Sequence, residues 1–126
     1  MQRSSNNPLP LGRQVCVARR RAGLSTKELA LKAGLSVAAV YNVERPDRSG
    51  RTRSLMKLAK ALGLKLRIPD FATLAKDRGL TAAQLASVAQ ISFDTSRAIL
   101  SNPVRGNLRS FEKVCAALGY SLALVF

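Results

Sequence analysis

The sequence has no histidine, no tryptophan, only two cysteines and only seven acidic residues. Without histidine it lacks the side chain that serves most often as a general base near neutral pH and as a metal ligand. Cys16 and Cys115 match no metal-binding spacing, and the chain has neither a useful pair of carboxylates nor a phosphate-cradling glycine loop. We therefore expect no enzymatic activity, no metal and no cofactor, and interpret the cysteines as buried core thiols of a cytoplasmic protein.

Long apolar runs and aromatic residues are also scarce. The longest apolar stretch lies near residues 120–126, far short of the roughly 20 residues that a membrane-spanning helix needs. The polar start lacks the apolar core of a secretory signal. With four Phe and two Tyr, the chain offers little for the stacking platforms of single-stranded nucleic-acid binders. We expect no membrane partner, and RNA binding is disfavoured.

Positive charge is in large excess. The chain carries 21 Lys and Arg and a formal net charge of +14, of which residues 1–69 contribute +12 and residues 70–126 only +2. Such a charge predicts a polyanionic partner without choosing among DNA, RNA and an anionic surface. Nearly all of the excess charge therefore lies in the first half.

A shift of 56 residues aligns the chain with itself without a gap. Fourteen identities fall between residues 15–68 and 71–124, and they include the pairs Gly23 with Gly79 and Gly63 with Gly119. Start signals, turn glycines and apolar positions share this register. The sequence therefore predicts a mainly α-helical chain with two tandem domains, over residues 11–69 and 70–126, after a disordered tail over residues 1–10.

Each copy shows the same order of four helices and a closing strand. Ser25 and Thr81 begin capping boxes, and Ser36 and Ser92 are N-cap candidates for the third helices. The expected helices of the first copy are 11–22, 26–33, 36–44 and 54–63, with Ser54 as the last cap. Those of the second copy are 71–78, 82–89, 92–100 and 110–119, with Ser110 as the last cap. The closing runs, 64–68 and 120–126, predict short strands that pair antiparallel with each other.

The second and third helices of the first copy form a helix-turn-helix pattern. Ala30 is small where the two helices cross, and Gly34 can take the positive φ that a tight turn requires. The apolar positions of the third helix fall on one face, which leaves the opposite face free to enter a DNA major groove. Helical hairpins of this kind also occur in bundles that bind no DNA, but here the charge agrees with the motif.

These residues resemble a known family. The segment 24–44 (LSTKELALKAGLSVAAVYNVE), followed by 55–63 (LMKLAKALG), resembles the phage-repressor/Cro-type (XRE) family of bacterial and phage regulators. The second copy resembles it less, because Gln90 replaces the turn glycine and Ser96 stands at the core position of Val40. The closing strands resemble those of antitoxin-type repressors, in which such strands help to pair two subunits.

The resemblance implies which side chains read bases. The groove-facing residues would be Ser36, Val37, Ala38, Tyr41 and Asn42 in the first copy and Ser92, Phe93, Asp94, Arg97 and Ala98 in the second. A carboxamide such as that of Asn42 pairs with adenine, and an arginine such as Arg97 pairs with guanine. Surface packing is the alternative for Tyr41 and Phe93, and a favourable helix-dipole interaction is the alternative for Asp94.

Phosphate contacts are expected beside these helices. The residues implied are Ser25 and Thr26 at the start of the second helix, Arg45, Arg48, Arg51 and Arg53 in and beside the basic loop, and Arg105 and Arg109 in the second copy. The run Arg19 to Arg21 is explained better by the C-terminus of the first helix and by solubility than by DNA.

The sequence therefore predicts a sequence-specific regulator that binds double-stranded DNA at the nucleoid. If both copies read DNA, one chain is a covalent pseudo-dimer with an asymmetric site. Otherwise the first copy reads DNA and the second dimerises. An alternative is an antitoxin-like or adaptor protein whose main role is to bind a protein partner, with DNA autoregulation secondary. A homodimer or protein partner would contact strands 64–68 and 120–126.

Overall fold

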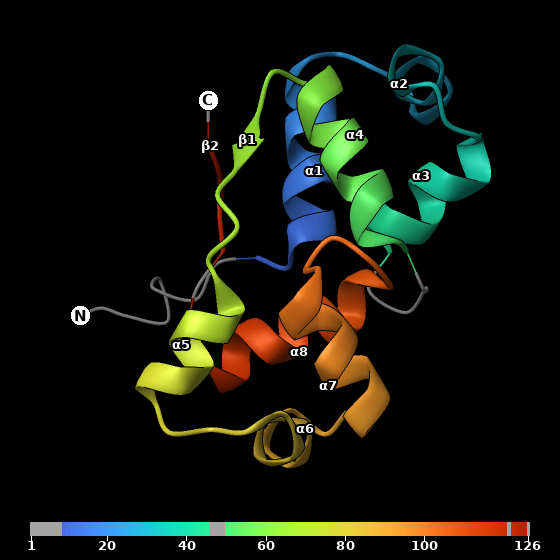
Figure 1. Cartoon of the computed structure of the whole chain (residues 1–126). Coiled ribbons are helices and arrows are strands. Elements are labelled where there is room, and N and C mark those ends of the chain that lie inside the picture. Colours follow the sequence, from blue (N-terminus) through green and yellow to red (C-terminus); the bar gives the residue numbers. More distant parts are fainter. Residues whose placement is uncertain (1–8, 46–49, 121, 126) are drawn as a thin grey trace.

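The computed structural model describes residues 9–45, 50–120 and 122–125. Within them the chain folds into eight helices and a two-stranded sheet (Figure 1), which confirms the mainly helical class. Except for Leu9 and Pro10, the predicted tail lies outside the described residues. The elements are α1 (Leu11–Arg21), α2 (Thr26–Ala33), α3 (Val37–Glu44), α4 (Thr52–Ala61), β1 (Lys65–Leu66), α5 (Phe71–Asp77), α6 (Ala82–Ala89), α7 (Phe93–Ser101), α8 (Leu108–Ala117) and β2 (Leu124–Val125).

Side-chain caps fix most helix starts where the sequence predicts them. Ser25 and Thr81 both form complete capping boxes, each with the residue three positions later. The predicted caps Ser54 and Ser110 are wrong, because α4 and α8 each begin two residues earlier. Asn107 caps α8 by accepting a hydrogen bond from the Ser110 amide at 2.8 Å. The cause is non-local, since main-chain pairing holds the residues just before both helices in an extended conformation.

The second half accommodates its two departures from the repressor pattern. Gln90 adopts the left-handed conformation of Gly34, with φ of 59° against 72°, and the Ile91 amide still closes the turn on the Ala86 carbonyl at 3.0 Å. Ser96 is fully buried at the core position of Val40, and its hydroxyl donates to the Ala82 carbonyl at 2.9 Å. The turn thus forms with a strained residue, and the buried hydroxyl has a partner.

Replacing Gln90 with glycine should stabilise the protein. Left-handed backbone costs a residue with a Cβ about 1 kcal/mol or more, and part of this is offset by the greater freedom of glycine in the unfolded chain. We expect Gln90→Gly to raise the free energy of unfolding in urea by up to about 1 kcal/mol. The reciprocal change, Gly34→Gln, is the control and should lower it. A loss of stability in Gln90→Gly would contradict this reading of the turn.

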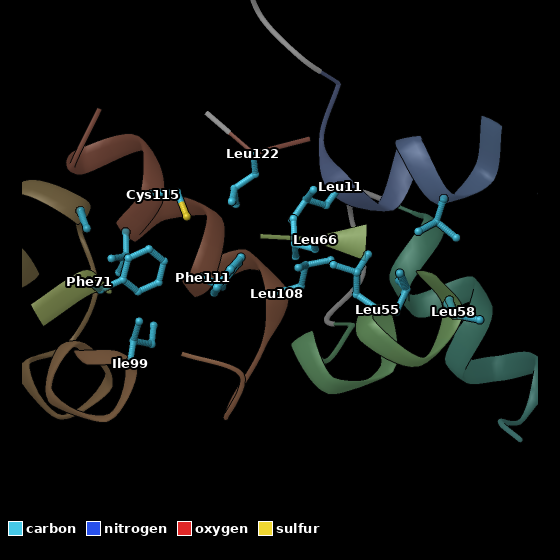
Figure 2. Close-up of a cluster of buried hydrophobic side chains, with 14 of the residues drawn as sticks. Leu11, Leu55, Leu58, Leu66, Phe71, Ile99, Leu108, Phe111, Cys115 and Leu122 are labelled. Carbon is cyan, nitrogen blue, oxygen red and sulfur yellow. The ribbon is translucent and has the colours of Figure 1, made fainter. Parts of the chain in front are cut away.

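One hydrophobic core runs through both halves of the chain. Phe71 and Phe111, both fully buried, lie with ring centroids 5.4 Å apart in the second half. Figure 2 shows Leu66 and Leu108 lying between these rings and Leu55 of the first half. The two halves therefore pack against each other through apolar side chains, and neither buries its apolar surface alone.

Two main-chain hydrogen bonds join the halves in a reciprocal arrangement. The Thr52 amide donates to the Gly106 carbonyl at 3.2 Å, and the Leu108 amide donates to the Gly50 carbonyl at 2.8 Å. Thr52 and Leu108 are equivalent positions of the 56-residue repeat, and so are Gly50 and Gly106. Exchanging equivalent residues therefore converts one bond into the other. A Cβ at Gly50 would lie 2.7 Å from the Asn42 carbonyl oxygen, so this close approach requires glycine.

The two strands also pair with each other inside the chain, as predicted. Lys65 lies opposite Val125 and Leu66 opposite Leu124, in antiparallel register. The Gln14 side chain of α1 covers the other edge of β2, because it donates to the Leu122 carbonyl at 3.2 Å and accepts from the Leu124 amide at 2.8 Å. The strand pair is therefore held to α1 as well.

A half-buried carboxylate and a buried thiol of α8 lie where the start of α1 meets α8. The Leu11 amide, at the start of α1, donates to Glu112 Oε2 at 3.1 Å. Burial raises the pKa of the Glu112 carboxyl. Burial, with a smaller effect of Glu112, raises the pKa of the Cys115 thiol to about 12. Cys115 is thus an un-ionised core thiol as predicted, whereas Cys16 is only half-buried.

Candidate nucleic-acid interface

The outer face of α3 gathers most of the predicted base-reading residues of the first half. Ser36, Val37, Ala38 and Tyr41 are exposed, while Val40 and Val43 on the opposite face are buried. The Arg45 guanidinium lies 5.8 Å from the centre of the Tyr41 ring, within range of a cation–π interaction. A shallow depression of about 360 Å³ is lined by Ala38, Tyr41, Asn42 and Arg45. The structure thus brings these side chains together on one surface.

Asn42 lies at the margin of this surface. Asn42 is half-buried. Besides lining the depression on α3, it borders a second cavity of about 340 Å³, which is lined by residues of α1, α3 and α8. Asn42 is thus less accessible than Tyr41, and reading a base with its carboxamide requires the side chain to point into the depression.

The hydroxyl groups at the helix starts differ between the halves. Ser25 Oγ accepts from the Glu28 amide and Ser36 Oγ from the Ala39 amide, both at 3.1 Å. These caps leave each hydroxyl hydrogen available for an acceptor such as a phosphate oxygen. Ser92 Oγ, in contrast, also donates its hydrogen to Thr95 Oγ1 at 2.8 Å. The α7 cap is therefore satisfied internally. Thr26 is half-buried at the start of α2.

The outer face of α7 carries a different set of exposed side chains. Phe93, Asp94, Arg97 and Ala98 all lie exposed on it. The Arg97 guanidinium lies 5.6 Å from the centre of the Phe93 ring, and the described residues hold no ion pair between Arg97 and Asp94. Arg97 is thus positioned by an aromatic ring, and Asp94 sits in the first turn of α7, where the helix dipole favours a carboxylate.

Exposed arginines flank both helices. Arg45 ends α3, Arg51 precedes α4, and Arg53 lies in its first turn. In the second half the equivalent loop carries Arg105, while Arg109 lies in the first turn of α8, and all five are exposed. Arg48, also predicted to contact phosphate, lies outside the described residues.

A largely buried ion pair that was not predicted joins α1 to α3. Arg19 Nε donates to Glu44 Oε2 at 2.8 Å and Arg19 Nη2 to Glu44 Oε1 at 3.1 Å, with 11% and 7% of the two side chains exposed. Arg19 Nη1 also donates to the Leu24 carbonyl at 2.9 Å. The hydrogen bonds to Glu44 raise the pKa of Arg19. Arg19 thus fixes the end of α3, whereas Arg20 and Arg21 are exposed.

The repeat contains a signal for this pair. At the positions 56 residues later stand Ala75 and Leu100, which are both apolar. Ala75 is buried in the core and Leu100 packs against it. Because both charges are absent together from the second half, the aligned sequences point to Arg19 and Glu44 as partners.

The segment from α1 to β1 also matches a known family. Residues 18–68 match the helix-turn-helix family HTH_3. The match supports an XRE-type helix-turn-helix, a type found in DNA-binding regulators, over these residues. No curated protein and no solved structure matched the chain.

The helix-turn-helix segment, residues 18–68, includes α2, α3 and α4 and excludes α5–α8. It contains all the predicted DNA-contacting residues of the first half. Among the described helices, none has the length and apolarity needed to cross a membrane.

Breaking the Arg19–Glu44 pair should destabilise the helix-turn-helix segment. Removing one partner of a buried pair leaves the other charge uncompensated, which costs about 3 kcal/mol. We expect Arg19→Ala and Glu44→Leu each to lower the free energy of unfolding by about that amount. The double variant, which copies Ala75 and Leu100, should lose clearly less than the sum. Additive losses in a double-mutant cycle would show that the pair is not coupled.

Neutralising arginines beside α3 should weaken binding to every DNA sequence about equally. Phosphate contacts fix register without reading bases, and each contributes about one unit to the slope of log K against log salt. We expect Arg45→Gln and Arg51→Gln each to reduce that slope by about one unit. Lys76→Gln on α5, which removes the same charge elsewhere, should leave it nearly unchanged. If all three variants reduced the salt dependence of binding equally, that dependence would reflect the net charge of the protein and not contacts at Arg45 and Arg51.

Proposed function

We propose that this protein is a transcriptional regulator that binds double-stranded DNA sequence-specifically through the helix-turn-helix segment. The observation that carries the proposal is the outer face of α3, where Tyr41 and Arg45 lie beside the exposed Ala38 in the family's recognition helix. A helix with this exposed face fits the DNA major groove, and the flanking arginines fit the phosphates on either side.

We further propose that one chain is a pseudo-dimer in which α7 is the second reader. The reciprocal main-chain bonds support this. Thr52 and Leu108 are equivalent positions of the repeat, as are Gly50 and Gly106, and each half donates to the other through the same pair of positions. Such an exchange requires the two halves to be related locally by an approximate two-fold axis. The strand register agrees, since continuing it by one residue brings Arg67 opposite Ala123, again 56 positions apart. Repressor dimers use such an axis to reach successive major grooves about 34 Å apart.

The positions of the two helices are compatible with this proposal. In Figure 1, α3 and α7 lie toward the same edge of the molecule, and β1 and β2 lie toward the opposite edge. Their outer faces differ at nearly every position, with Tyr41 equivalent to Arg97 and Val37 to Phe93. The expected site is therefore asymmetric, with more phosphate contacts under α3.

Two other roles remain as alternatives to the pseudo-dimer. In the first, α5–α8 dimerise or contact another protein while α3 alone reads DNA, which fits the low charge of residues 70–126. In the second, the protein is antitoxin-like or an adaptor, with DNA binding secondary. Both predict a partner at the strands, but β1 and β2 pair with each other in this chain, so strand pairing needs no second subunit.

Alanine substitution in each reading helix distinguishes one reader from two. A bidentate base contact contributes about 1–3 kcal/mol of discrimination. We expect Asn42→Ala and Arg97→Ala each to weaken specific binding about tenfold or more, while nonspecific binding changes much less. Ser87→Ala, on the exposed face of α6, serves as the control. The binding sequence for these titrations comes from selection out of a random DNA pool.

The outcomes separate the proposals. A loss for Asn42→Ala alone would assign DNA reading to α3 and reject the two-reader chain. A selection that enriches no sequence would reject sequence-specific binding itself.

A further inference from the structure

A groove between α4 and β1 is open in the first half of the protein. It has a volume of about 480 Å³, and its apolar lining includes Met56, Ala59, Leu64 and Leu66. Four cations stand exposed around it, namely Arg53, Lys57, Lys60 and Lys65, and Arg53 is also one of the predicted phosphate contacts. Apolar surface ringed by charges of one sign is typical of a surface that binds a partner of the opposite sign.

The equivalent groove of the second half is partly filled by the same chain. Between α8 and β2 the positions 56 residues later, Glu112, Cys115, Tyr120 and Leu122, line a cavity together with Leu9, Pro10 and Leu11 of the same chain. Leu11 is 1% exposed there, and its amide donates to Glu112 Oε2 at 3.1 Å. Leu9 and Pro10 are exposed beside it, and Leu11 is the first residue of α1. The second half thus shows one apolar side chain of the same chain buried at this position.

The open groove differs from the partly filled one in charge. Met56 stands where the partly filled groove has Glu112, Lys60 replaces Ala116, and Lys65 replaces Ser121. These changes remove a carboxylate and add two cations. A segment that binds the open groove is therefore expected to carry carboxylates beside its apolar side chains.

We propose that the groove between α4 and β1 binds an acidic segment of another protein through apolar and charged contacts. A second copy of this chain is a poor occupant, because each copy carries a net charge of +14. DNA is a poor occupant as well, since an apolar floor offers nothing to phosphates. In Figure 1, β1 also lies toward the edge opposite α3. Such a segment would attach this protein to a partner while α3 stays free.

A labelled peptide tests this proposal on the full chain. The probe is a fluorescent peptide with a Leu-Pro-Leu core flanked by glutamates, and binding is followed by anisotropy. We expect Lys57→Glu/Lys60→Glu to weaken its binding at least about tenfold, because two attractions become repulsions. The matched control, Lys76→Glu/Lys113→Glu, changes the net charge equally and includes the repeat equivalent of Lys57. It should weaken binding about threefold at most.

A second peptide isolates the apolar contribution. Replacing both leucines of the probe with serine should reduce binding to the parent protein at least about tenfold. Equal binding by the two peptides, or equal losses in the two charge-reversal variants, would overturn the proposal and leave only general attraction to a basic protein. The proposal would also be overturned if Lys57→Glu/Lys60→Glu lost clearly more DNA binding than the control variant. Self-association that the same variant abolishes would assign the groove to a second copy and also overturn it.

Discussion

The arrangement of the two halves depends on a short antiparallel contact between two loops, in which Gly50 and Thr52 exchange main-chain hydrogen bonds with Leu108 and Gly106. Main-chain bonds are directional, and two reciprocal ones fix both the distance and the orientation of the segments that they join. Because α4 and α8 begin immediately after this contact and α3 and α7 end shortly before it, the contact also sets the relation of the two helices proposed to read DNA. The strand pair repeats the same symmetry at the other end of the molecule.

The halves reach stable structures by different means. In the first half a buried ion pair attaches the end of α3 to α1, while in the second Ala75 and Leu100 take the place of that pair. Replacing a buried pair with apolar side chains is often neutral or stabilising. Stability alone therefore does not require this ion pair. Because the pair holds the last residue of α3, it suits a role in orienting the helix whose outer face carries Tyr41.

Local physical chemistry made much of the fold predictable. The capping boxes at Ser25 and Thr81 and the positive φ at Gly34 depend on neighbouring residues only, so a single sequence reveals them. The starts of α4 and α8 depend on main-chain pairing between residues 56 positions apart. The ion pair of Arg19 and Glu44 depends on the tertiary fold, which brings together two residues 25 positions apart. Exposure of Val37, Tyr41, Phe93 and Arg97 followed from the resemblance to the repressor family. The half-buried position of Asn42 did not, because it depends on Gly50 and α8 approaching α3.

The pseudo-dimer proposal requires one chain to contain both reading helices. The mass of the complex with the shortest selected DNA duplex, measured by native mass spectrometry, distinguishes it from a homodimer. We expect one chain per duplex on a site without two-fold symmetry. Two chains on a palindromic duplex, with no complex of one chain at lower protein concentration, would contradict it and would establish an ordinary homodimer.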